Sequence, residues 1–158
     1  MKRRKSGYVS MALAGLFMIT IQTSCSKNDN NSSSNNTYKV SASADGNQEV
    51  PAVTTSGTGS VTGTYDANTK ILQYNVSWSN LSGTATAAHF HGPAAPGSNA
   101  TVVVPFTIIN NGNSGTATGR DTLTAAQETD FLAGKWYFNV HTAAHPSGEI
   151  RGQVSATK

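Results

Sequence analysis

The sequence predicts an all-β fold, an antiparallel β-sandwich with seven to eight strands and one short helix. Three observations lead to this prediction. Apolar and polar residues alternate with a period of two through most of residues 37–158, as they do in strands that bury one face. Clusters of Asn, Asp, Ser and Gly, which favour turns, interrupt this alternation at short intervals. Residues 124–134 alone have helix signals instead.

The strands are expected in the following segments, in chain order: about residues 38–45, 57–65, 72–79, 86–91, 101–109, 115–122, 135–142 and 149–156. The clearest alternation is in the third segment, where the apolar residues are Leu72, Tyr74, Val76 and Trp78. Pro105 has no backbone N–H, so its strand is expected at an edge or with a bulge. Short antiparallel strands at this spacing indicate a sandwich of immunoglobulin-like or Greek-key type.

One short helix is expected between the sixth and seventh strands. Thr124 and Gln127 have the spacing of a capping box, in which each side chain bonds the backbone of the other residue. Gly134 stands where such a helix should end. We expect the helix to pack Phe131 and Leu132 on the sheet.

Residues 1–24 have the pattern of a signal peptide for export. Residues 2–5 are basic, and residues 9–21 form an apolar stretch of 13 residues, shorter than the about 20 residues of a membrane-spanning helix. The only cysteine, Cys25, follows closely and is similar in position to the lipidated cysteine of bacterial lipoproteins. Gln22 departs from the usual aliphatic residue, and ordinary signal cleavage beside an incidental cysteine is the alternative. We expect a lipid-anchored protein of the cell envelope, at the outer membrane or cell surface.

The rest of the chain is nearly neutral. Residues 25–36 are expected to form a disordered linker after the lipidated cysteine, since residues 28–36 contain no hydrophobic side chain. Four of the 11 Lys and Arg residues lie in residues 2–5, so seven remain against eight Asp and Glu. This balance argues against nucleic-acid binding. Residues 37–158 are expected to form one domain.

All four histidines lie in two short motifs, residues 89–94 and 139–146. On a strand through the first motif, His89 and His91 share one face because side chains alternate. On a strand through the second, His141 lies on the face opposite the apolar residues Trp136, Phe138 and Val140. If the two strands are neighbours, these three imidazoles meet in one polar site.

Other polar residues are expected around the histidines. Asn139 shares the face of His141, and Glu149 and Arg151 lie opposite Ile150 in the last long strand. We expect these residues on a polar face outside the core, with Tyr137 exposed beside them. The direction of the fourth histidine, in the turn after its strand, is left open.

Two interpretations of this face compete. In the first, the residues serve structure: the histidines bond backbone groups of neighbouring loops, and Arg151 pairs with Glu149 or a loop carboxylate. In the second, the imidazoles bind one zinc or copper ion, the metals that suit nitrogen ligands. Asn139 and Glu149 would then orient the rings. The candidate ligands are His89, His91, His141 and, as a possible fourth, His145.

Three motifs in the chain resemble the chordin-domain (CHRD) family. They are Gln-Glu-Val-Pro at residues 48–51, Ala-Ala-His-Phe-His-Gly-Pro-Ala at 87–94, and Tyr-Phe-Asn-Val-His-Thr at 137–142 running into Pro-Ser-Gly-Glu-Ile-Arg-Gly-Gln at 146–153. The resemblance extends over about residues 38–155. Ala52 departs from the second proline that members of the family often have.

The resemblance implies a β-sandwich module of extracellular type with no established reaction. The family occurs in animal chordins, which bind and antagonise bone morphogenetic proteins, and as single domains in exported bacterial proteins. We therefore expect a non-catalytic binding or interaction module with no catalytic residues. Its partners would be the membrane, through the lipid anchor, and an extracellular protein or glycan.

A metal-dependent enzyme is a more remote alternative. The histidine motifs and Arg151 are loosely similar to the copper ligands and arginine of copper superoxide dismutases. In that comparison Arg151 would attract the anionic substrate. The chain lacks the histidine-rich zinc loop and the disulfide of the copper–zinc enzymes.

Overall fold

The computed structural model describes Gly7 and residues 36–158. The expected signal peptide apart from Gly7, the lipidation site Cys25, and the linker up to residue 35 therefore lie outside the described residues. The folded part of the described chain is residues 36–158. Within the described part of the chain, no helix is long and apolar enough to cross a membrane.

The domain is built from ten strands, one α-helix and one short 3-10 helix. In chain order these are β1 (Thr37–Asp45), η1 (Gly46–Gln48), β2 (Thr58–Asp66), β3 (Ile71–Ser79), β4 (Ala85–His91), β5 (Val102–Pro105), β6 (Thr107–Asn110), β7 (Gly115–Thr122), α1 (Ala125–Leu132), β8 (Tyr137–Thr142), β9 (Ile150–Gln153) and β10 (Ser155–Thr157). All strand pairings are antiparallel. The predicted all-β class is confirmed.

The expected number of strands was too low because two long strands each change partners at one residue. β5 pairs with β4 and β6 pairs with β7, with Phe106 between them. Pro105, which cannot donate a backbone hydrogen bond, stands where the ladder to β4 ends. In the same way β9 pairs with β8, whereas β10 pairs with β1 after Val154. Eight expected strands thus become ten.

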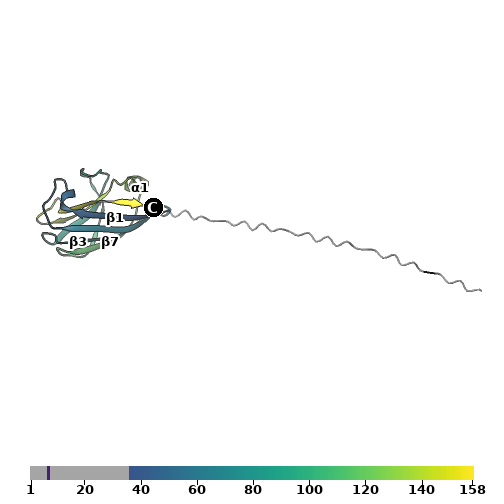
Figure 1. Cartoon of the computed structure of the whole chain (residues 1–158), viewed down its shortest axis with the longest axis horizontal. Helices are drawn as coiled ribbons and strands as arrows, with labels where there is room; N and C mark the ends of the chain where they lie inside the picture. Colours follow the sequence, from purple (N-terminus) through teal and green to yellow (C-terminus); the bar gives the residue numbers. More distant parts are fainter. Residues whose placement is uncertain (1–6, 8–35) are drawn as a thin grey trace, which may run out of the picture. The chain divides into compact units, whose positions relative to one another are not determined.

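These two changes of partner turn the sheet into a flattened barrel. The strand order is β5-β4-β8-β9-β1-β2-β3-β7-β6, so β5 and β6 lie at opposite ends of the order although they are almost consecutive in the chain. β9 and β1 share only the Asp45–Arg151 pair. One layer is therefore β5-β4-β8-β9, and the other is β10-β1-β2-β3-β7-β6, of which β1, β3 and β7 are labelled in Figure 1.

The apolar faces of the two layers meet in one core. Tyr74 of β3 and Phe90 of β4 contact each other across the layers with ring centroids 5.0 Å apart. The helix closes one end of the core, where the Phe131 ring lies 5.4 Å from the ring of Tyr65 and 5.3 Å from that of Trp136. The predicted helix, its capping box and its packing are confirmed.

Candidate functional site

The outer face of the layer formed by β4, β8 and β9 is buried beneath loops. The sequence predicted a polar face here, and the side chains do point away from the core. They are not exposed, however: Tyr137 is 3 % exposed and Arg151 is 1 % exposed. The expectation that Tyr137 is exposed is wrong, because the sequence gives the direction of a strand residue but not what covers it.

Arg151 holds one of these covering loops, residues 92–100. Its guanidinium donates hydrogen bonds to Asn99 Oδ1 (3.0 Å) and to the backbone carbonyl of Ser98 (2.5 Å). The guanidinium carbon lies 3.4 Å from the centroid of the Tyr137 ring, a cation–π contact. The expected ion pair with Glu149 or a loop carboxylate is wrong, since the ion pairs of the described chain are Lys70–Glu128 and Lys135–Asp130.

Glu149 is fully buried and is satisfied by hydroxyl and backbone donors. Its Oε1 accepts hydrogen bonds from Thr55 Oγ1 and Ser82 N, each at 2.7 Å. Its Oε2 accepts from Ser82 Oγ at 2.6 Å and Thr142 Oγ1 at 2.7 Å. Burial by itself raises the pKa of Glu149, but the hydrogen bonds from these donors outweigh it and lower the pKa to about 2. Glu149 is therefore a charged anchor that joins three segments of chain.

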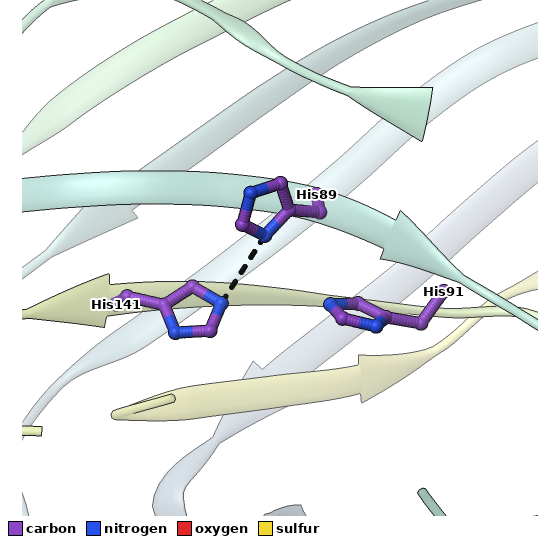
Figure 2. A group of neighbouring side chains, drawn as sticks. All are labelled: His89, His91 and His141. Atoms are coloured by element: carbon purple, nitrogen blue, oxygen red, sulfur yellow. Dashed lines mark hydrogen bonds between the residues drawn. The ribbon is translucent and has the colours of Figure 1, made fainter. Parts of the chain in front are cut away.

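We call the buried polar residues on this outer face the polar layer; they include Asn139, Glu149 and Arg151. Three histidines form a cluster beside it, His89 and His91 on β4 and His141 on β8 (Figure 2). His89 Nδ1 lies 3.2 Å from His141 Nε2. One potential ligand nitrogen from each ring lies within 4.8 Å of the others. The predicted meeting of the three imidazoles is confirmed, because β4 and β8 are paired and Asn139 stands opposite His89.

His145 is not part of this cluster. Its backbone N–H donates to Thr142 Oγ1 at 3.3 Å, and the residue lines a separate hollow together with Glu49. Of the expected ligands, the structure therefore brings together three and leaves the fourth outside. Its suggested role as a ligand remains a prediction from sequence.

Backbone carbonyls fix the protonated nitrogen of two of the rings. His91 Nδ1 lies 3.0 Å from the carbonyl oxygen of Ala100, and His141 Nδ1 lies 2.9 Å from that of Pro146. A carbonyl only accepts hydrogen bonds, so each Nδ1 must carry its proton. In the neutral rings both Nε2 atoms are then free to act as acceptors or as metal ligands, the arrangement common for metal-binding histidines.

The side-chain amide of Asn139 bridges these two Nε2 atoms. Asn139 Oδ1 lies 3.0 Å from His91 Nε2 and 2.9 Å from His141 Nε2. Asn139 is 3 % exposed, so its amide cannot form hydrogen bonds with bulk water instead. Asn139 therefore contacts the rings at the nitrogens that a metal ion would use, and it occupies the space between them. The expected role of Asn139 and Glu149 in orienting metal-bound rings remains a prediction from sequence, and the side chain of Glu149 accepts hydrogen bonds from Thr55, Ser82 and Thr142.

The histidines are held in their neutral form. Burial, with the neighbouring His141 and His91, lowers the pKa of His89 to about 4. Burial is also the main cause that lowers the pKa of His91 and of His141. The His91 ring is stacked on Tyr137, with centroids 4.8 Å apart and planes at 1°, and the Arg151 charge lies near that ring. No proton competes strongly with a metal for these nitrogens at neutral pH.

The spacing fits a metal ion in part. Two nitrogens bound at about 2.0–2.1 Å to a tetrahedral zinc ion lie about 3.3–3.4 Å apart, close to the 3.2 Å between His89 and His141. The ligand nitrogens of the three rings are at most 4.8 Å apart. The longest of these nitrogen–nitrogen distances must therefore shorten by no more than about 1.5 Å to match tetrahedral zinc coordination. Two ligands are thus preformed, and the third requires a small movement with displacement of the Asn139 amide.

Glu49 also belongs to the site, although it was not among the site residues predicted from the sequence. It follows η1, is 7 % exposed, and its Oε1 is buried without a hydrogen-bond partner in the described structure. Burial raises the pKa of Glu49 to about 7, although the charge of Arg151 and hydrogen bonding with Val50 and Asn139 act in the opposite direction. The available signal was the Gln-Glu-Val-Pro motif at residues 48–51.

A family model for the CHRD domain matches residues 40–154. The chain belongs to the CHRD-domain family. The match includes both histidine motifs and the Gln-Glu-Val-Pro motif, so the buried polar layer lies wholly within the CHRD domain. Searches of curated proteins and of solved structures find no significant match to the chain.

The anchoring role of Glu149 predicts a large effect of removing its charge. Glu149→Gln places an NH2 group against donors that need an acceptor, so we expect the free energy of unfolding to fall by about 2–3 kcal/mol. Urea denaturation at pH 7 measures the change. Asp130→Asn is the control, because it removes a charge from a more exposed ion pair, the 3.6 Å contact of Asp130 with Lys135, and should cost less than about 1 kcal/mol. Equal losses in both variants would contradict the anchoring role.

The lowered pKa of His89 predicts a pH-dependent contribution to stability. Below its ordinary value of 6.5 the unfolded chain takes up a proton at His89, whereas the folded chain does so only near pH 4. In chelator, the free energy of unfolding of the wild type minus that of His89→Gln should therefore decrease as the pH falls from about 6.5 to 4. The difference isolates His89 from Glu49, whose raised pKa acts in the opposite direction. A difference independent of pH would refute the assignment.

Proposed function

We propose that this CHRD domain is a non-catalytic binding module of the cell envelope that binds a zinc or copper ion at His89, His91 and His141. The observation that carries the proposal is the cluster of three imidazole nitrogens within 4.8 Å. Export and anchoring at Cys25 rest on the pattern of the N-terminal sequence, as does an extracellular protein or glycan as partner.

The chemistry of the cluster selects the class of metal. All three candidate ligands are imidazole nitrogens, which suit zinc and copper, whereas calcium and magnesium require oxygen ligands. The two carboxylates of the polar layer are not in the cluster. Glu149 is committed to four hydrogen bonds, so it contributes order to the layer and no ligand to the ion.

The position of Arg151 favours binding over redox catalysis. In the comparison with copper superoxide dismutases, this arginine would attract an anionic substrate from solvent. Arg151 is instead 1 % exposed, and its guanidinium is engaged by Asn99, Ser98 and the Tyr137 ring. A guanidinium in this position stabilises the loop above it, and its charge is poorly accessible to an anion that approaches the histidines from solvent.

Calorimetric titration with zinc, and then with copper(II), tests the proposal. The protein should carry Cys25→Ser, so that the thiol does not bind the metal. We expect one ion per chain, and binding more than about 100-fold weaker in His89→Ala and His141→Ala, since even partners outside the ligand shell contribute about 10–100-fold.

His145→Ala is the matched control, because it removes the histidine that lies outside the cluster. Its affinity should equal that of the parent protein. Binding that is absent from the parent, or that survives in His89→Ala, would contradict the metal site. Consumption of superoxide by the copper-loaded protein would contradict the non-catalytic assignment.

A further inference from the structure

The carboxyl group of Glu49 and the amide of Asn139 face each other beneath Gly148. A Cβ atom built at Gly148 would lie 2.2 Å from Glu49 Oε1 and 2.8 Å from Asn139 Nδ2, so the two polar groups border the same small space. Gly148 has φ +127°, a conformation that favours glycine. The backbone is thus shaped to let a buried carboxyl group approach a buried amide.

The hydrogen-bond requirements of the histidines decide which way this amide points. With Nδ1 of both His91 and His141 protonated, a neutral ring presents a lone pair at Nε2. Two lone pairs require two donors, and the NH2 group of Asn139 carries two N–H bonds. An amide oxygen in that place would require both rings to be doubly protonated, placing two charges side by side in a buried cluster. Rotation of the amide by about 180° exchanges its two ends.

We propose that Glu49 is a positioning residue for the histidine site: its protonated carboxyl group donates a hydrogen bond to Asn139 Oδ1 and thereby turns the NH2 group towards His91 and His141. This assignment gives Glu49 Oε1, which otherwise lacks a partner, a hydrogen bond. It also gives His91 Nε2 a donor, and it gives His141 Nε2 a donor in addition to its 3.2 Å contact with His89 Nδ1. The result is one continuous chain of hydrogen bonds from Glu49 through Asn139 to two of the histidines.

The surroundings of Glu49 allow it to hold a proton near neutral pH. Its raised pKa of about 7 results from burial, which outweighs the charge of Arg151 on β9. From the 143–149 loop, His145 lines the same hollow as Glu49. Above this pKa the carboxylate needs a donor itself, and it competes with the histidines for the single NH2 group of Asn139.

This competition ties Glu49 to metal binding, and here the inference rests on the proposed function. A metal ion takes the Nε2 lone pairs and frees the NH2 group of Asn139. The freed group can donate to the Glu49 carboxylate, which releases its proton to solvent. Ionisation of Glu49 would therefore favour the metal-bound arrangement, because the NH2 group then turns from the two Nε2 atoms towards the carboxylate and no longer competes for their lone pairs.

Nitrogen-15 NMR of the metal-free protein in chelator tests the positioning role without a metal. The probes are the Nε2 resonances of His91 and His141 between pH 5.5 and 8.5. In the wild type we expect both to move with a midpoint near pH 7, the pKa of about 7 raised by burial of Glu49, as they lose their donor. Glu49→Gln should abolish the movement, since a Gln amide at this position does not ionise. Glu128→Gln, the same chemical change far from the site, should retain it.

Two results would overturn the proposal: Nε2 resonances that stay constant in the wild type, or the same movement in Glu49→Gln. If that variant does not fold, the wild type alone decides, because the Glu49 carboxyl carbon must titrate with the same midpoint as the two nitrogens. Different midpoints would refute the coupling. Zinc titration of the same samples separates the two proposals, since a wild type that shows the coupled movement but binds no zinc contradicts the metal site alone.

Discussion

The constraint on which the domain depends is that β8 is buried on both faces. One face contributes Phe138 and Val140 to the core, and the other carries Tyr137 and Asn139 beneath loops. A polar layer without solvent must satisfy its own hydrogen bonds, because each unpaired buried group costs about 1–3 kcal/mol. The loops are therefore held by the same side chains that they cover, and the histidine cluster forms where this layer meets the surface.

Two carboxyl groups of the polar layer, those of Glu149 and Glu49, lose their hydration on burial, and their pKa values respond in opposite directions. Glu149 keeps its charge because four donors compensate the loss of water. Glu49 has fewer donors, so burial raises its pKa to about 7. One carboxyl group is a fixed anchor, whereas the other has a proton that it can lose near neutral pH. The number of donors around each group makes the difference.

The histidine cluster combines the two interpretations of its sequence motifs. Its rings bond backbone carbonyls of the 92–100 and 143–149 loops, as a structural role requires. The same bonds leave Nε2 of two rings available and hold His89 and His141 at a separation suited to one ion. The structural network thus sets the tautomers that the proposed metal ion would require, and the Asn139 amide occupies the space between the rings.

The sequence by itself determined the strands, the capped helix and the face on which each histidine lies, because these follow from local alternation and capping. Only the tertiary structure decided that Phe106 and Val154 divide two strands between layers, and that Arg151 and Glu149 are buried and apart. Such features depend on which loop covers which face, and on donors such as Ser82 that are distant in sequence. Alternation gives the direction of a side chain, whereas its surroundings come from segments that only folding brings together.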